Sequence, residues 1–102
     1  MGRRERITVP LSEEDRLEIT IEKEGGRVNG FVVNYVATVG GQDHSVVRFD
    51  TRHGSPHKDV MSRGGRVEHK DWMPTVDGHR IIDIAIDDIK GNWKTYRRRS
   101  ER

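Results

Sequence analysis

The fold is decided by the stretch LEITIEKEGGRVNGFVVNYVATV, residues 17–39. Apolar and polar side chains alternate from Leu17 to Ile21, which is typical of a strand with one buried face. The two central glycines indicate a hairpin turn, because glycine readily adopts positive φ. A second strand follows over residues 28–39, and apolar side chains on both of its faces indicate a central strand. The stretch therefore predicts an antiparallel hairpin.

Further elements extend this hairpin towards the C-terminus. A glycine pair precedes a third strand over residues 44–52, residues 53–65 have the composition of a loop, and residues 66–70 form a short fourth strand. A C-terminal helix follows an entry with Thr75 or Asp77 as its cap. Its apolar stripe consists of Ile82, Ala85, Ile86, Ile89, Trp93 and Tyr96. We therefore predict an α+β fold, with a three- to four-stranded antiparallel meander and the C-terminal helix packed on one face.

A strand is the alternative to a helix for part of this C-terminal segment. Ile82, Ile84 and Ile86 also alternate with acidic side chains, as they would in a strand, and Gly91 weakens a helix interior. The stripe continues beyond this segment to aromatic side chains without an interrupting turn, so the helix is favoured. It leaves Ile84 on the exposed side.

The length of 102 residues predicts one domain, residues 1–102. Residues 1–10 are expected to form a flexible arm and residues 97–102 a basic tail. Hydrophobic residues make up 31% of the chain and charged residues 35%, so the core has a thin margin that a homodimer contact would supplement.

The composition also excludes several classes of protein. Without cysteine there are neither disulfides nor thiolate zinc sites, which fits a cytoplasmic setting. No apolar run approaches the roughly 20 residues that span a membrane, and the N-terminus lacks the apolar region of a secretory signal. Nucleotide-binding glycine motifs are missing too, so no cofactor is predicted.

Charge is concentrated at the two ends of a chain whose net charge is only +2. Basic residues gather within the first six and the last nine residues. Such ends can hold a polyanion such as RNA, although a solubilising tail is the more common role of a basic terminus.

The richest cluster of reactive side chains is RFDTRHGSPHKD, residues 48–59. Its candidate site residues are Arg48, Asp50, His53, His57 and Asp59. A tight turn between the histidines would fold His57 back towards His53 and Asp50. Three interpretations of this group are open.

The first interpretation is general acid–base cleavage of RNA. His53 and His57 would be the acid–base pair, since histidine titrates near neutral pH. Asp50 would fix a histidine tautomer, and Arg48 would neutralise the phosphate without any metal. Lys58 is a lesser candidate.

The second interpretation is a divalent metal site with His53, His57, Asp50 and Asp59 as ligands, because nitrogen and oxygen donors suit zinc, manganese or iron. The third is structural, since such side chains commonly cap turns. Each residue taken singly favours the structural interpretation. The group taken together favours a site, with cleavage or phosphate binding ahead of a metal.

The motif carries a resemblance to known proteins. Residues 48–59, followed by IDDIKGNW at residues 86–93, resemble a family of small uncharacterised prokaryotic proteins with the signature R-[YF]-D-x-x-H-G-x-x-H-x-D. In character these are similar to the TumE-type toxins of toxin–antitoxin pairs. The resemblance covers roughly residues 30–98. It implies a ribonuclease-like role, an antitoxin partner and a site made of Arg48, Asp50, His53, His57 and Asp59.

Two functions follow as hypotheses. The leading one is a small RNA-directed protein, a metal-independent endoribonuclease of toxin type. The alternative is a non-catalytic binding or interaction module that ligates a divalent metal through His53, His57 and Asp59.

Overall fold

A computed structural model describes residues 2–51, 55–73 and 78–101 of the chain. Within these ranges there are six strands and one helix. Their bounds are β1 Gly2–Pro10, β2 Asp15–Glu24, β3 Arg27–Val39, β4 Gln42–Asp50, β5 His57–Met61, β6 Val67–Trp72 and α1 Gly78–Ser100.

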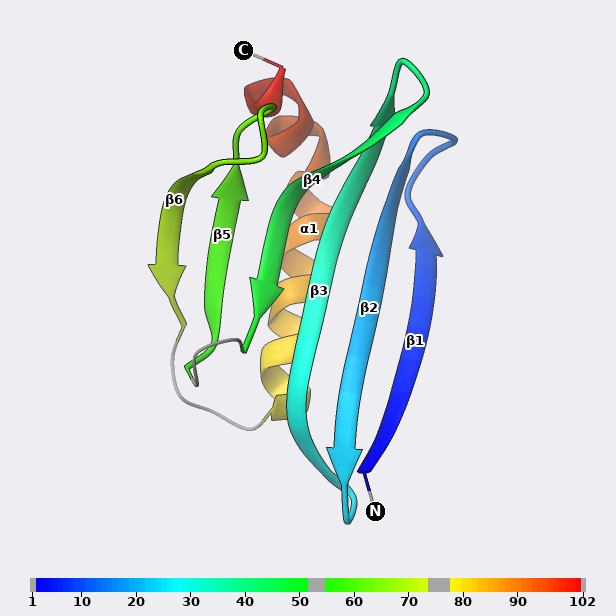
Figure 1. Cartoon of the computed structure of the whole chain (residues 1–102), viewed down its shortest axis with the longest axis vertical. Coiled ribbons are helices and arrows are strands. Elements are labelled where there is room, and N and C mark those ends of the chain that lie inside the picture. The colour runs from blue at the N-terminus through cyan, green and yellow to red at the C-terminus, as the bar shows by residue number, and fades with distance from the viewer. Residues whose placement is uncertain (1, 52–54, 74–77, 102) are drawn as a thin grey trace.

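The strands form one antiparallel sheet in the order β1-β2-β3-β4-β5-β6. Each strand therefore pairs with its neighbour in sequence, which is a meander. Helix α1 lies behind the sheet in Figure 1 and packs mainly on β3 and β4. The predicted α+β class, the antiparallel sheet and the helix packed on one face are confirmed.

The predicted count of three to four strands is wrong, because the described residues contain six. Strand β1 occupies the segment expected to be a flexible arm, where three arginines obscure the weak alternation of Ile7 and Val9. Strand β5 lies inside the expected loop. Its buried positions include His57 and Asp59 rather than apolar residues, so hydrophobic periodicity gives no strand signal there.

The predicted hairpin turns are present. Gly25 and Gly26 have φ of 57° and 80°, and Gly40 and Gly41 repeat this pattern at 59° and 79°. Two successive positive φ values are what a type I′ turn requires, and such turns match the twist of the flanking strands.

The core lies between the sheet and α1. Its buried apolar side chains from the sheet are Leu17, Ile19, Phe31, Val33, Tyr35, Ala37, Val46, Val47 and Phe49, and those from the helix are Ile81, Ile82, Ala85 and Ile89. Trp93 and Tyr96 pack against this cluster, while Ile84 is 42% exposed, as predicted. The proposed helix caps Thr75 and Asp77 lie outside the described residues.

Helix α1 continues through most of the expected basic tail and ends at Ser100. Arg97 in this last turn reaches back to β2, where its Nη1 lies 2.6 Å from Oδ2 of the buried Asp15. The side chain of Arg97 therefore fastens the end of the helix to the sheet. No helix in the described ranges is both long and apolar enough to span a bilayer.

Alternation along β4 and β5 separates two groups of side chains. Val47 and Phe49 belong to the core beneath α1, so Arg48 and Asp50 lie on the other side of the sheet, which we call the open face. On β5, Lys58 is paired with Phe49 in register and reaches the helix.

Candidate functional site

Four of the predicted site residues meet on the open face of β4 and β5. In the register of this strand pair, Arg48 lies opposite Asp59 and Asp50 lies opposite His57. Directly opposite residues of antiparallel strands share a face and lie within contact distance. The hairpin, rather than a helix or a tight turn, therefore assembles these side chains.

The imidazole of His57 is held on both sides. Its Nε2 lies 3.1 Å from Asp50 Oδ1 and 3.4 Å from Asp59 Oδ2. Its Nδ1 lies 3.2 Å from the carbonyl oxygen of Ser55, which can only accept, so Nδ1 carries a proton. Because Nδ1–H is engaged in this way, Nε2 is the nitrogen that faces both carboxylates.

Arg48 flanks the two aspartates. Its Nε lies 2.9 Å from Asp50 Oδ2, and its Nη2 lies 3.6 Å from Asp59 Oδ2. With a protonated His57, the two positive charges of Arg48 and His57 would equal the two negative charges of Asp50 and Asp59. With a neutral His57, the group would carry a net negative charge.

We call Asp50, His57 and Asp59 the Asp–His–Asp cluster. Its members are 0%, 2% and 2% exposed, although they lie on the open face. Trp72 of β6 is paired with His57 in register, and their ring centroids are 5.4 Å apart. Lys70 Nζ lies 3.8 Å from Asp59 Oδ1. Burial makes charged groups costly unless they are paired or bind a metal.

The cluster has the composition of a metal centre. One ligand atom from each of its three residues can be chosen so that all lie within 4.8 Å of one another. Two ligands that each lie about 2.0–2.1 Å from a metal are about 2.8–3.0 Å apart in octahedral geometry and about 3.3–3.4 Å apart in tetrahedral geometry. The two distances from His57 Nε2, 3.1 Å and 3.4 Å, lie close to these separations.

The structure describes only some of the predicted site residues. Arg48, Asp50, His57 and Asp59 come together, while His53 and the neighbouring Arg52 lie outside the described residues. The convergence of His53 with His57 therefore stays a prediction. His57 is too deeply buried to touch a substrate in this arrangement of the chain.

Lys58, the lesser acid–base candidate, lies on the helix side of the sheet. Its Nζ donates to Asp88 Oδ2 at 3.0 Å and to the Tyr96 hydroxyl at 2.5 Å. Burial lowers the pKa of Lys58, but these hydrogen bonds outweigh burial and raise the pKa above its ordinary value. Lys58 therefore stays protonated and joins β5 to α1 rather than serving as a base.

Sequence reasoning missed Lys70 and Trp72, which border the cluster from β6. Their alternation with Asp71 gives a weak strand signal, but only the pairing of β5 with β6 places Trp72 beside His57. Since β5 was expected to be loop, that pairing could not be predicted.

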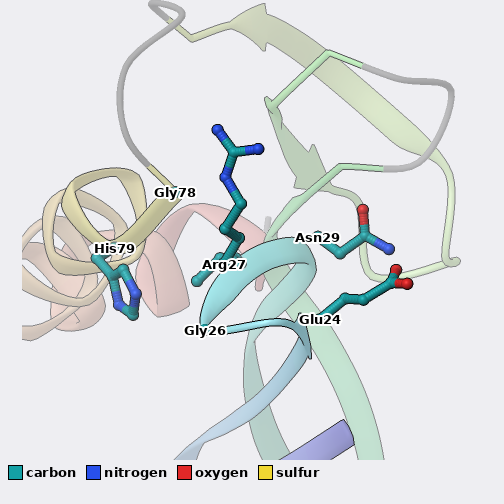
Figure 2. A pocket seen from close by; sticks show the side chains of 7 residues that line it. Glu24, Gly26, Arg27, Asn29, Gly78 and His79 are labelled. Atoms are coloured by element: carbon teal, nitrogen blue, oxygen red, sulfur yellow. The ribbon is translucent and has the colours of Figure 1, made fainter. Parts of the chain in front are cut away.

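A separate hollow of about 620 Å³ lies between the β2–β3 hairpin and the start of α1. Figure 2 shows that its side chains do not converge, since Arg27 and His79 point in different directions and Glu24 lies apart from both. Gly78 lies so close to β3 that a Cβ there would be 2.8 Å from Val28 Cβ. The hollow is therefore a crease between packed elements and not a second cluster.

The basic ends do not form one surface. The N-terminus and the C-terminal end of α1 lie at opposite ends of the long axis in Figure 1, and the molecule extends 41 Å along it. At the N-terminal end, Arg3 and Arg4 form ion pairs with Glu5 and Glu22. A polyanion shorter than this separation would therefore meet one basic end at a time.

Comparison with known proteins identifies the family. The chain belongs to a family described as Domain of unknown function (DUF7718), whose sequence profile matches residues 1–102. The predicted membership of a small uncharacterised family agrees with this match. Searches of the curated proteins and of the solved structures returned no match.

Proposed function

We propose that this domain is a divalent-metal-binding module, with Asp50, His57 and Asp59 as its ligands. The observation that carries the proposal is the convergence of one imidazole nitrogen and two carboxylates in a buried cluster. His57 meets the requirement for a ligand, because Nδ1–H is held by a backbone carbonyl and Nε2 is left to bind.

Asp15 provides an internal comparison for a buried carboxylate with a structural role. Its oxygens accept hydrogen bonds from Ser12, Tyr35 and Arg97. Oδ1 of Asp59, in contrast, is buried and has no hydrogen-bond partner among the described residues, with Lys70 Nζ at 3.8 Å, beyond hydrogen-bond distance. Such an oxygen is costly to bury, and a bound cation would offset the cost.

The donor set indicates the class of metal. One imidazole and two carboxylates suit zinc, manganese or iron(II), whereas calcium and magnesium prefer all-oxygen ligands. Three protein ligands leave coordination positions for water or a further ligand. Arg48 would then hold Asp50 in position from outside the ligand set.

Metal titration tests the proposal. We expect calorimetry to give one site per chain for Zn²⁺ or Mn²⁺. Asp59→Asn should weaken the affinity for the metal by more than about 100-fold. Mutation of a residue that contacts a ligand but not the metal typically weakens this affinity by about 10–100-fold. The matched control is Asp71→Asn, which alters an exposed carboxylate that lies 3.0 Å from His69 but has no third ligand beside it in the described part of the chain.

Two titration results would contradict metal binding by the cluster. If the wild-type domain binds neither metal, or if both asparagine variants lose affinity equally, the cluster is an ion-pair network. Circular dichroism of Asp59→Asn separates lost ligation from lost folding.

RNA cleavage and an antitoxin partner stay predictions. Direct acid–base chemistry at His57 requires the cluster to open, because this side chain is 2% exposed. Incubation of a mixed RNA pool with wild-type and His57→Ala proteins, each with and without a chelator, separates the hypotheses. Metal-independent cleavage predicts activity in chelator that the variant lacks.

A further inference from the structure

Two rows of side chains cross strands β4, β5 and β6 on the open face. In one row, Asp59 of β5 lies opposite Arg48 on one side and Lys70 on the other. In the neighbouring row, His57 lies opposite Trp72. Both rows lie outside the irregular part of the β5–β6 pairing, so opposite residues share a face. Arg48, Lys70 and Trp72 therefore surround the Asp–His–Asp cluster on one side of the sheet.

These three surrounding side chains, which we call the rim, reach solvent although the cluster does not. The side chains of Arg48 and Lys70 are 25% and 40% exposed, and Trp72 has the largest exposed fraction of any large apolar residue in the described ranges. The rim, rather than His57, is therefore the part of this face that a dissolved ligand can touch.

The two cations of the rim converge on one carboxylate. Arg48 Nη2 lies 3.6 Å from Asp59 Oδ2, and Lys70 Nζ lies 3.8 Å from Asp59 Oδ1. Neither contact is short enough for a hydrogen bond, so both cationic groups have N–H donors to offer to a second acceptor. A guanidinium and an ammonium that lie close together are suited to bind a phosphate.

Metal binding would make this site strongly positive. Without a metal and with a neutral His57, the charges of Arg48 and Lys70 cancel those of the two carboxylates in the cluster. A divalent ion leaves two positive charges in excess. A phosphate monoester carries about −1.5 to −2 at pH 7, so it matches this excess more closely than a carboxylate or a phosphodiester does.

Trp72 offers a surface for a flat ring next to the cations. Its indole contacts His57 on one side, with the ring centroids 5.4 Å apart, and more than half of the residue is exposed. Lys70 Nζ lies 5.8 Å from the centre of the indole, a distance that the ribose of a nucleotide can span. A single exposed tryptophan is ordinary on a protein surface. A tryptophan beside a phosphate-binding pair of cations is instead typical of a site on which a nucleobase stacks.

We propose that the metal-loaded domain binds a nucleoside monophosphate, free or at the 5′ end of a nucleic acid, with the phosphate at Arg48 and Lys70 and the base on Trp72. The inference rests on the proposed metal binding, which supplies the excess positive charge, and adds the class of ligand. All contacts come from side chains, so the absence of a glycine-rich nucleotide motif is consistent with it.

Calorimetry with a nucleotide and its two halves tests the proposal. Protein loaded with one equivalent of Zn²⁺ and freed of excess metal is titrated with AMP, adenosine and ribose 5-phosphate. We expect AMP to bind with a Kd below about 1 mM. Each half should bind at least about tenfold more weakly, because adenosine lacks the phosphate and ribose 5-phosphate lacks the base. Metal-free protein should also bind AMP at least about tenfold more weakly.

Variants of the rim assign the contacts. Trp72→Ala should weaken the binding of AMP by about fivefold or more and leave that of ribose 5-phosphate unchanged. Lys70→Ala should weaken the binding of both by about tenfold or more. The matched control is Lys90→Ala, which removes an exposed cation from α1 on the other side of the sheet and should change neither affinity. The Zn²⁺ content of each variant is measured in the same samples.

The outcomes separate this inference from the metal site on which it rests. A wild-type protein that retains no Zn²⁺ would contradict both. A Zn²⁺-loaded protein that binds AMP no better than either half, or that binds AMP equally well after Trp72→Ala and Lys70→Ala, would overturn the nucleotide site alone. If AMP binds as expected, a 5′-phosphorylated dinucleotide distinguishes the two sources of the ligand. Tighter binding of the dinucleotide than of AMP assigns a nucleic-acid end, and weaker or equal binding assigns the free nucleotide.

Discussion

Tyr35 is the single residue whose ionisation the fold alters most clearly. Its side chain is fully buried in the core, and its hydroxyl donates to Asp15 Oδ1 at 2.5 Å. Burial and this hydrogen bond raise the pKa of the Tyr35 hydroxyl well above its ordinary value of 10. The folded domain therefore holds the tyrosine proton at a pH where the unfolded chain releases it.

The sign of the resulting pH dependence follows from linkage. Above pH 10 the native state binds more protons than the unfolded state, so the stabilisation from Tyr35 falls as the pH rises. We expect Tyr35→Phe to lower the free energy of unfolding by about 1–3 kcal/mol at pH 7, because Asp15 loses a donor. This deficit should shrink above pH 10 by about 1.4 kcal/mol per pH unit.

Urea unfolding of both proteins between pH 7 and 11 measures this difference. Other groups, including Tyr96, titrate in both proteins and cancel in the comparison. A deficit that stays constant up to pH 11 would contradict the role assigned to Tyr35.

Most of the candidate site residues could be predicted from the sequence. The burial of these residues and their contacts could not. The density of charged and imidazole groups predicted Arg48, Asp50, His57 and Asp59 as one group. Their burial could not be predicted, because it depends on β6 packing alongside β5. Lys58 was grouped with them by proximity in sequence, whereas strand alternation sends it to the other side of the sheet.

Helix α1 contains two glycines whose surroundings differ, which makes a matched pair. A Cβ at Gly78 would lie 2.8 Å from Val28 Cβ, whereas a Cβ at Gly91 would meet nothing within 4 Å. We expect Gly78→Ala to destabilise the domain by about 1–3 kcal/mol through overpacking. Gly91→Ala should stabilise it by about 0.5–1 kcal/mol through helix propensity.

Thermal or denaturant unfolding of the two alanine variants gives the comparison directly. Stabilisation by Gly78→Ala as well as by Gly91→Ala would show that α1 does not approach β3 as closely as described. The helix could be predicted from its apolar stripe, but this close approach could not, since it is a property of two segments far apart in sequence.

Predictability of the strands depended on where their apolar residues lie. Apolar and polar side chains alternate in strands β2, β3 and β4, and glycine pairs connect these strands. All three strands were therefore predicted. Strand β1 has little core contact and β5 buries polar residues, so neither gave the expected pattern. Hydrophobic periodicity fails where a strand buries charged groups or contributes little to the core.

At the scale of the whole molecule, the separation of the basic ends limits any binding of RNA. Only one end can engage a short strand, and among the described residues the last two turns of α1 offer three exposed cations, Lys94, Arg98 and Arg99. We therefore expect the affinity for a short single-stranded RNA to fall with salt with a log–log slope no steeper than about −2. Fluorescence anisotropy across a salt series measures this slope. A slope of about −4 or steeper would show that both ends act together.

Anomalous diffraction from crystals grown with Zn²⁺ would show whether the Asp–His–Asp cluster binds a divalent metal. We expect one peak per chain, about 2.0–2.2 Å from an oxygen of Asp50, Nε2 of His57 and an oxygen of Asp59. Full density for the cluster without an anomalous peak, and with His57 still in contact with both carboxylates, would contradict the claim and leave Asp50, His57, Asp59 and Arg48 as a buried ion-pair network.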